Sequence, residues 1–505
     1  MKSVAGCAKL YYKLFAKGIF RMSEKNTMTR NAMLFLPAKV LEGVLLLLMS
    51  SLYTHIFTKE AAGAFGFVQQ TMNFAYLLVA AWMANASTRY AAEEYKRDKA
   101  GGLLSTMTVV YLLMGIVGVG SCAALGAATG DTRFLPGAVM FCTYTAFTIL
   151  INTLVQLDRV RPAILFSLLS ASLKLLVAIL LVGGKSNYPD PTPGFIANIV
   201  ADGLGALGAV FALGMPSVVR FQRASRAMLG KLLGYGVPLM GVALCSGLLT
   251  LFDRFYIYGV FGDATGGIYY YNSSIPNSVF TMLSVGVLRG VYPAILRAWN
   301  ERSHEEAKTL LGAGVRLYLL VALPAAFGLA AVSTTFCRVF FAEGYDAGAP
   351  VIWMTAFAMV FMGLTEYANK GYELEQDTKP VLSNCAVAMV VKIVSSIFFV
   401  HLMGFTGGAM GSVVAFATYF VLTACRVRKY FMWRVPMGSF LRILISAVLC
   451  GSAALACCLF LPCGELLRLV CAIVAGAGVY AVCLIASGEA KEELAGLLRR
   501  LNKTK

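Results

Sequence analysis

Stretches of about twenty apolar residues recur along the whole chain, and this recurrence limits what the chain can fold into. About twenty residues is the length that a helix needs to cross the hydrocarbon core of a membrane. A soluble core could not bury so much apolar surface, because 59% of the 505 residues are hydrophobic and only 13% are charged, against about 25% charged in soluble domains. We therefore expect an all-α polytopic membrane protein with about 14 transmembrane helices. The expected spans are 33–57, 64–88, 102–124, 133–157, 163–183, 194–214, 235–260, 267–292, 312–336, 348–370, 380–402, 405–425, 440–461 and 466–487.

The connections between these spans alternate between basic and nearly uncharged. The segment before Asn31 contains seven lysine and arginine residues, whereas the next connection, FTKEAAG, contains one. Because lysine and arginine are retained on the cytoplasmic side of a membrane, we expect a protein of the cytoplasmic membrane with both termini in the cytoplasm. The net charge of +18 then reflects topology, and nucleic acid is not an expected partner.

Two halves of the chain show a faint internal repeat. Pro37 precedes an outward turn that ends at Gly63, and Pro238 precedes a similar turn that ends at Gly267. This pattern favours two parallel six-helix lobes followed by an appended helix pair. The expected organisation is a basic amphipathic segment that suits anionic lipids (1–30), an N-lobe (31–215), a cytoplasmic linker (216–231), a C-lobe (232–425), a basic connection (426–439), the appended pair (440–487) and a basic cytoplasmic tail (488–505).

The sequence offers little for metal binding or covalent chemistry. The thirteen cysteines form no Cys-X-X-Cys pair, and the three histidines lie far apart, so no metal site is expected. The outward connections are short, which disfavours a membrane glycosyltransferase or polymerase with an outward catalytic domain. We therefore expect a protein that is not an enzyme.

Charged residues inside the expected spans are the main candidates for function. A charge at bilayer depth costs about 2.5–3.5 kcal/mol on insertion scales, so such residues normally face a bundle interior or a hydrated path. Asp253 and Arg254 are neighbours in the stretch TLFDRFYIYGVF and point about 100° apart on a helix, so one should face a cavity while the other reaches an adjacent helix. Arg289, in the following span, lies deep enough to join Arg254.

Three further bases inside the spans are candidates for substrate binding. Lys39 lies three residues before Glu42 on the same helix face, so the two either neutralise each other or serve the substrate. Lys174 and Lys392 occupy matching positions near the middle of the fifth and eleventh spans.

The remaining intramembrane charges suggest coupling sites or helix contacts. Asp202, and Glu366 with Lys370 one turn later, are candidates for Na⁺ or proton coupling or for helix packing. Arg316 and Arg442 lie near the cytoplasmic ends of their spans, where long side chains extend to the interface. Polar side chains on the second span either bind sugars or hold helices together, namely Gln69, Gln70, Asn73 and Asn85.

Bases outnumber acids seven to four inside the spans, and this excess indicates an anionic substrate. Arginine matches phosphate better than other anions, and a lipid-linked diphosphate sugar supplies such a group. The membrane potential would assist export of this dianion by about 2.3 kcal/mol per charge per 100 mV. A MATE-like cation-coupled exporter remains the alternative, although it would favour unpaired acids.

Three stretches carry a resemblance to a known family: LFDRFYIYGVFGDATGGIYYYNSS (251–274), LYTHIFTKEAAGAFGF (52–67) and GFTGGAMGSVVAF (404–416). The chain resembles the oligosaccharide and polysaccharide flippases (Wzx-like) of the MOP exporter superfamily, which also contains MATE exporters and lipid II flippases. Its fourteen spans resemble the lipid II and sporulation-type branches. Its first span, however, presents Lys39 with Glu42 where those branches present arginines, which counts against lipid II as the cargo.

The resemblance implies two lobes around a central cavity that opens alternately to each side of the membrane. The implied cargo is an oligosaccharide on an undecaprenyl diphosphate type of lipid, moved from the inner to the outer leaflet for cell-surface polysaccharide biosynthesis. Arg254, Arg289 and Lys39 are the implied diphosphate contacts, other polysaccharide-synthesis membrane proteins are implied partners, and no cofactor is implied.

Overall fold

The computed structural model describes residues 27–98, 100–130, 133–157, 159–301, 303–375, 377, 379–429, 432–433 and 435–489. For residues 27–40, 92, 97, 125, 129, 238, 239, 242 and 289 it describes the backbone alone. The predicted basic amphipathic helix lies almost entirely outside the described residues, as does the basic C-terminal tail. In the part described, the regular elements are helices, apart from a single backbone bridge between Phe57 and Tyr188.

The N-lobe is built from seven helices, of which two together form the second expected span. They are α2 (Thr27–Ile56), α3 (Lys59–Val79), α4 (Ala81–Asp98), α5 (Gly101–Thr129), α6 (Phe134–Gln156), α7 (Val160–Val182) and α8 (Thr192–Leu213). Thr58 caps α3, since its side-chain oxygen accepts a hydrogen bond from the backbone N–H of Ala61 at 3.2 Å. The linker that follows contains the short α9 (Met215–Val218) and η2 (Phe221–Arg223).

The C-lobe begins with α10 (Arg226–Asn300), which consists of two helices joined at a sharp reversal. Gly262 has φ 76° and ψ −176° at this point, a conformation that essentially only glycine adopts. The reversal separates the seventh and eighth expected spans. The rest of the lobe comprises α11 (His304–Phe340), η3 (Tyr345–Gly348), α12 (Ala349–Leu374), α13 (Lys379–Met403), η4 (Gly404–Thr406) and α14 (Gly407–Val427), and the appended pair is α15 (Met437–Phe460) and α16 (Glu465–Ala486).

The membrane prediction is confirmed by the length and surface of these helices. Ten ranges of the described chain are long and apolar enough to cross a membrane, and two of them, 243–300 and 379–427, each contain two helices. Large apolar side chains face outward along these helices, including Ile116 at 70% exposure and Phe460 at 81%. A soluble protein would bury such side chains, so this surface is suited to lipid.

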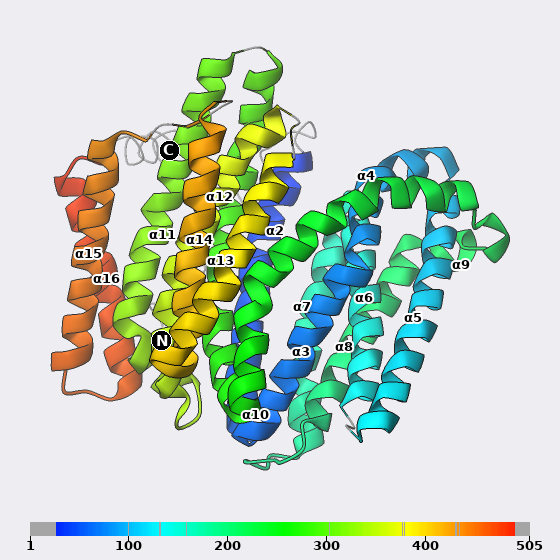
Figure 1. The fold of residues 1–505 in the computed structure, drawn as a ribbon, viewed down its shortest axis with the longest axis horizontal. Coiled ribbons are helices and arrows are strands. Elements are labelled where there is room, and N and C mark those ends of the chain that lie inside the picture. The colour runs from blue at the N-terminus through cyan, green and yellow to red at the C-terminus, as the bar shows by residue number, and fades with distance from the viewer. Residues whose placement is uncertain are drawn as a thin grey trace, which may run out of the picture.

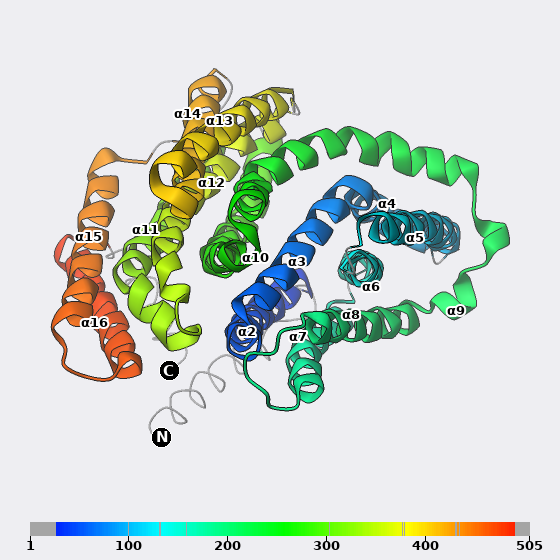
Figure 2. The same cartoon turned by 60° about the horizontal axis from the view of Figure 1, so that its bottom comes forward.

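The N-lobe and the remaining helices of the C-lobe lie on either side of α10 (Figure 1, Figure 2). This helix packs against α3 and α4 of the N-lobe and against α11, α12, α13 and α14 of the C-lobe. In Figure 1 its reversal lies at the lower end of the molecule, next to the start of α3, and the appended pair lies outermost against α11. Because it belongs to the C-lobe and packs against both lobes, α10 carries most of the contact between them. A further contact joins α2 to the end of α11, where Ser51 Oγ donates to the Phe340 carbonyl.

The end of α16 is tied to α11 and α15 by one carboxylate. Glu489 accepts from Arg316 Nε at 2.7 Å, from Arg442 Nη1 at 3.4 Å and from the Ser439 hydroxyl. Arg316 is therefore anchored inside the protein rather than simply extended to the interface, while Arg442 is 55% exposed and partly extended. Burial disfavours the ionised form of Glu489, but hydrogen bonds from Ser439 and Arg316 outweigh this effect and lower its pKa below the ordinary 4.5.

We expect Glu489→Gln to destabilise the protein by about 1–3 kcal/mol at neutral pH, since hydrogen bonds to a charged group are lost. A lowered pKa in the folded state gives stability that is present above pH 4.5 and lost as the pH falls through the folded value. The difference in melting temperature between parent and variant in detergent should therefore shrink below pH 4.5. A difference that stays constant down to the folded pKa would contradict the ionic role.

Candidate functional site

Asp253 and Arg254 lie in the last third of the first half of α10, eight to nine residues before the reversal at Gly262, and point into different surroundings. Both side chains are buried, with exposures of 4% and 7%. Asp253 faces the interior of the C-lobe, whereas Arg254 faces α3 of the N-lobe. The divergence follows from the angle of about 100° between successive residues of a helix.

Asp253 is held in an ion pair inside the C-lobe. Its Oδ2 atom lies 3.1 Å from Lys392 Nζ on α13 and accepts a hydrogen bond from Ser412 Oγ on α14 at 3.1 Å. The Tyr269 hydroxyl also donates to this carboxylate, and the Lys392 amine donates to Ser412. The side chain of Lys392 is completely buried. One carboxylate and one amine thus connect α10, α13 and α14.

The glycine-rich stretch 404–416 allows these helices to approach one another. A Cβ atom on Gly411 would lie 2.7 Å from the backbone of Ser396 on α13. A Cβ on Gly408 would lie 2.7 Å from Ile257 Cδ1 and 3.3 Å from Asp253 Cβ on α10. Side chains at either position would push α14 away, so the glycines set the short distances around Lys392.

A second buried ion pair lies inside the N-lobe. Lys174 Nζ on α7 is 2.9 Å from Asp202 Oδ1 on α8, and Ser170 Oγ donates to the same oxygen at 2.7 Å. Lys174 and Lys392 therefore have similar surroundings, since each holds a buried carboxylate together with a serine hydroxyl. Both lysines, predicted as substrate contacts, are engaged within their own lobes.

Arg254 lies where the two lobes meet, and its partners are neutral. Its Nη1 atom donates to Gln70 Oε1 on α3 at 2.8 Å, and its guanidinium lies 5.6 Å from the centre of the Tyr270 ring. Gln70 is fully buried, and its Nε2 atom has no partner among the described residues. Within the same part of the chain, no carboxylate forms an ion pair with Arg254. A buried cation without an acidic partner is poised to meet an anion.

The lobes are in direct contact at the end of the molecule next to this arginine. A Cβ atom on Gly63 of α3 would overlap the carbonyl oxygen of Asp263, and a Cβ on Gly267 would lie 2.7 Å from Gly63 Cα. The Tyr258 hydroxyl donates a hydrogen bond to the Gly63 carbonyl at 2.9 Å, and Arg133 Nη1 lies 2.7 Å from Asp263 Oδ2. These contacts close the end of the molecule that the charge pattern predicts to face outward.

We expect Gly63→Ala to disfavour this closed arrangement by about 1–3 kcal/mol, because the added methyl group overlaps the backbone of α10. Separation of the lobes should expose Ala62, whose carbonyl accepts from Tyr271 of α10. In a background without native cysteines, Ala62→Cys should then react with a water-soluble maleimide about tenfold faster than without the glycine change. Gly259→Ala is the matched control, since a Cβ there meets nothing within 4 Å; equal rates in all three proteins would refute the steric role.

The remaining predicted site residues are placed as follows. Lys39 lies on α2 and Arg289 on the second half of α10, but their side chains lie outside the described residues. Glu42 is half-buried on α2. Lys370 pairs with Glu373 at 2.6 Å and lies 5.1 Å from the centre of the Tyr292 ring, while Glu366 is partly buried on α12.

Several residues of the site were not predicted as site residues. Tyr269, Tyr270 and Ser412 are ordinary residues of apolar helices by sequence, and nothing in their spacing marks them. Gln70 carried a signal, since an amide in the middle of a span needs a partner, but its partner lies in another lobe. The structure shows no group of three or more potential metal ligands in the portion of the chain that it describes.

The comparison with family models decides among the transporter classes that this architecture allows. The model described as "Lipid II flippase MurJ" matches residues 86–475. The chain belongs to the MurJ family. This family lies in the MOP superfamily and consists of flippases, so the protein is a membrane transporter and not an enzyme. The predicted kinship to MOP flippases is confirmed, whereas the narrower Wzx-like assignment finds no support in this match.

Solved structures agree with the MurJ assignment at the level of the fold. A lipid II flippase MurJ in an inward closed conformation has a TM-score of 0.72 and 15% identity, over 92% of this chain and 100% of that chain. An inward-facing multidrug resistance MATE transporter of the MOP superfamily has a TM-score of 0.60 and 14% identity, over 78% and 94%. A MOP superfamily transporter from Pyrococcus furiosus has a TM-score of 0.56 and 13% identity, over 81% and 97%. A comparison with curated proteins finds no match.

Proposed function

We propose that this MurJ-family protein moves a saccharide linked to a lipid diphosphate from the inner to the outer leaflet of the cytoplasmic membrane. The observation that carries this proposal is Arg254, a buried guanidinium at the meeting of the two lobes whose contacts are neutral. Arginine binds phosphate oxygens through parallel hydrogen bonds. A diphosphate that enters between the lobes would replace Gln70 as its partner.

The same contacts support an alternating-access mechanism. Among the described residues, closure at the predicted outward end involves small residues, the hydrogen bond from Tyr258 to Gly63 and the ion pair of Arg133 with Asp263, whose side chains are 32% and 36% exposed. An exposed pair of this kind contributes only about 0–1 kcal/mol, so it opens at little cost. Substrate at Arg254 would favour separation of α3 from α10, because it competes with the contact to Gln70 that holds them together.

We propose the membrane potential as the driving force. The pairs Asp253 with Lys392 and Lys174 with Asp202 are each internally neutral, so they carry no net charge across the field. A substrate dianion gains about 2.3 kcal/mol per charge per 100 mV when it leaves an inside-negative cell. Arg289 and Lys39 are proposed as additional diphosphate contacts, and both termini are proposed to be cytoplasmic.

A flipping assay in proteoliposomes tests the proposal and identifies the cargo. Two fluorescent substrates would be compared at a fixed potential: lipid II and an undecaprenyl diphosphate oligosaccharide. The family match supports lipid II, whereas the single lysine of the first span supports the oligosaccharide. Transport of either substrate that rises with an inside-negative potential is the expected result, whereas failure to move both, with export of a lipophilic cation instead, would overturn the proposal.

A further inference from the structure

A large cavity lies at the junction of the C-lobe and the appended helix pair, away from Arg254. It has a volume of about 1850 Å³, which exceeds the roughly 300–1,000 Å³ of a site for a small molecule. Its walls come from the start of α11, the end of α14, residues 432, 433, 435 and 436 of the connection to α15, the start of α15 and the residues after α16. Since the exposed Arg428 and Met437 lie among its lining residues, the cavity is open to its surroundings.

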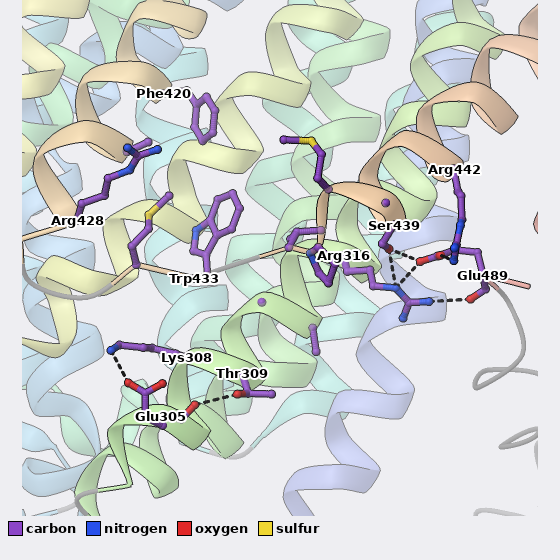
Figure 3. Close-up of a pocket in the computed structure, with 18 of the residues that line it drawn as sticks. Glu305, Lys308, Thr309, Arg316, Phe420, Arg428, Trp433, Ser439, Arg442 and Glu489 are labelled. Carbon is purple, nitrogen blue, oxygen red and sulfur yellow. Dashed lines mark hydrogen bonds and ion pairs between the residues drawn. The ribbon is translucent and has the colours of Figure 1, made fainter. Parts of the chain in front are cut away.

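The charges around the cavity leave an excess of cations. Four basic side chains line it, Lys308, Arg316, Arg428 and Arg442, against the two acids Glu305 and Glu489. Figure 3 shows these charges in three places: Glu305 with Lys308, Glu489 with Arg316 and Arg442, and Arg428 apart from both groups. The cavity therefore has two positive charges that no lining carboxylate balances.

Arg428 and Arg442 are the cations available to a ligand. Arg428 is exposed, and within the described residues its side chain forms no hydrogen bond or ion pair; its backbone N–H donates to the Arg426 carbonyl. Arg442 is 55% exposed, and its ion pair with Glu489 is long, at 3.4 Å. Residues 490–505, which follow Glu489, contain five basic and two acidic residues, so they supply no net negative charge. The two guanidinium groups are therefore available to an anionic group of another molecule.

The rest of the lining is apolar and aromatic. Phe420 and Trp433 stack with their ring centres 6.4 Å apart, and Val421, Met432 and Met437 continue this surface. Tryptophan is enriched at the level of lipid headgroups in membrane proteins. An apolar wall beside free guanidinium groups suits a molecule that has both a phosphate and an acyl chain. A soluble anion would leave that wall unused.

We propose that this cavity binds the phosphate headgroup of an anionic phospholipid. The part of the acyl chains nearest the headgroup would pack against Phe420 and Trp433. Basic pockets between transmembrane helices on the cytoplasmic side bind such headgroups, and the charge pattern places this end of the bundle in the cytoplasm. Arg428 lies in the connection that follows α14, and Arg442 lies on α15. A headgroup bound to both arginines would link this connection to α15. It would thereby hold the appended pair against the C-lobe, independently of transport through Arg254.

Native mass spectrometry of the full chain in detergent tests the site with two probes, phosphatidylglycerol and phosphatidylcholine. We expect the parent to retain phosphatidylglycerol preferentially, and Arg428→Gln with Arg442→Gln to bind it on the order of tenfold more weakly. The matched control is Arg226→Gln with Lys379→Gln, which removes two exposed bases that do not line the cavity and should leave binding unchanged.

Three results would overturn the proposal. They are equal binding of both lipids by the parent, unchanged binding in the double variant, and an equal loss in the control. Displacement of phosphatidylglycerol by millimolar inorganic pyrophosphate would instead assign the cavity to a soluble anion. If the double variant fails to fold, Arg428→Gln alone provides the test, because Arg428 contributes no ion pair to the described fold. This single variant should still weaken phosphatidylglycerol binding severalfold.

Discussion

Lys392→Met is expected to lower the free energy of unfolding by about 3–5 kcal/mol, because it leaves the carboxylate of Asp253 buried without its cation. Lys392 is completely buried and Asp253 is 4% exposed, so water cannot replace the lost partner. The Oδ1 atom of Asp253 has no hydrogen bond among the described residues even in the parent. The measurement is the melting temperature of the purified protein in detergent, together with its inactivation rate, since unfolding of large proteins is commonly irreversible.

A double replacement distinguishes the contribution of the ion pair to stability from that of the packing of the Lys392 side chain. Asp253→Asn combined with Lys392→Met removes both charges, and a buried pair replaced in this way usually regains most of the lost stability. Glu305→Gln is the matched control, because it breaks an ion pair with Lys308 in which the Glu305 side chain is 87% exposed. This variant should lower the free energy of unfolding by about 1 kcal/mol or less. A double variant no more stable than Lys392→Met would show that the charge balance is unimportant.

Arg254→Ala is expected to reduce transport of the lipid-linked substrate by about 10- to 100-fold, because a charge-assisted contact to the diphosphate is lost. Melting temperature should change little compared with Lys392→Met, since Arg254 has no ion pair within the described residues. Initial flipping rates in proteoliposomes at fixed potential measure the effect. Arg254→Lys should retain part of the rate, because it keeps the charge but loses the paired geometry of the guanidinium.

Gln70→Ala distinguishes substrate binding from lobe closure. If Arg254 acts only by joining α10 to α3, removal of its partner Gln70 should impair transport as strongly as removal of the arginine. If Arg254 contacts the diphosphate, Gln70→Ala should retain most of the rate and show a higher apparent affinity, because competition for the guanidinium is gone. Equal loss in both variants would therefore refute the proposed contact while leaving the flippase function intact.

The all-helical membrane architecture was predictable because its signals are local. Each span is marked by about twenty apolar residues, and the described helices follow the fourteen expected spans, with the hairpin of α10 reversing at Gly262 between the seventh and eighth. The different directions of Asp253 and Arg254 also followed from helix geometry. The glycines of 52–67 and 404–416 were recognised as a pattern, but their role as contact points was not.

The sequence by itself determined that the chain crosses a membrane many times and carries bases within its helices, since apolar length and charge are properties of short segments. Tertiary structure alone decided which charge meets which partner. Lys392 contacts Asp253, and Arg254 contacts Gln70, because α10 packs on different neighbours with its two faces. The physical reason is that a buried charge is stabilised by whichever polar group the packing of distant helices brings within hydrogen-bond distance, and glycine contacts such as Gly63 with Gly267 fix that packing.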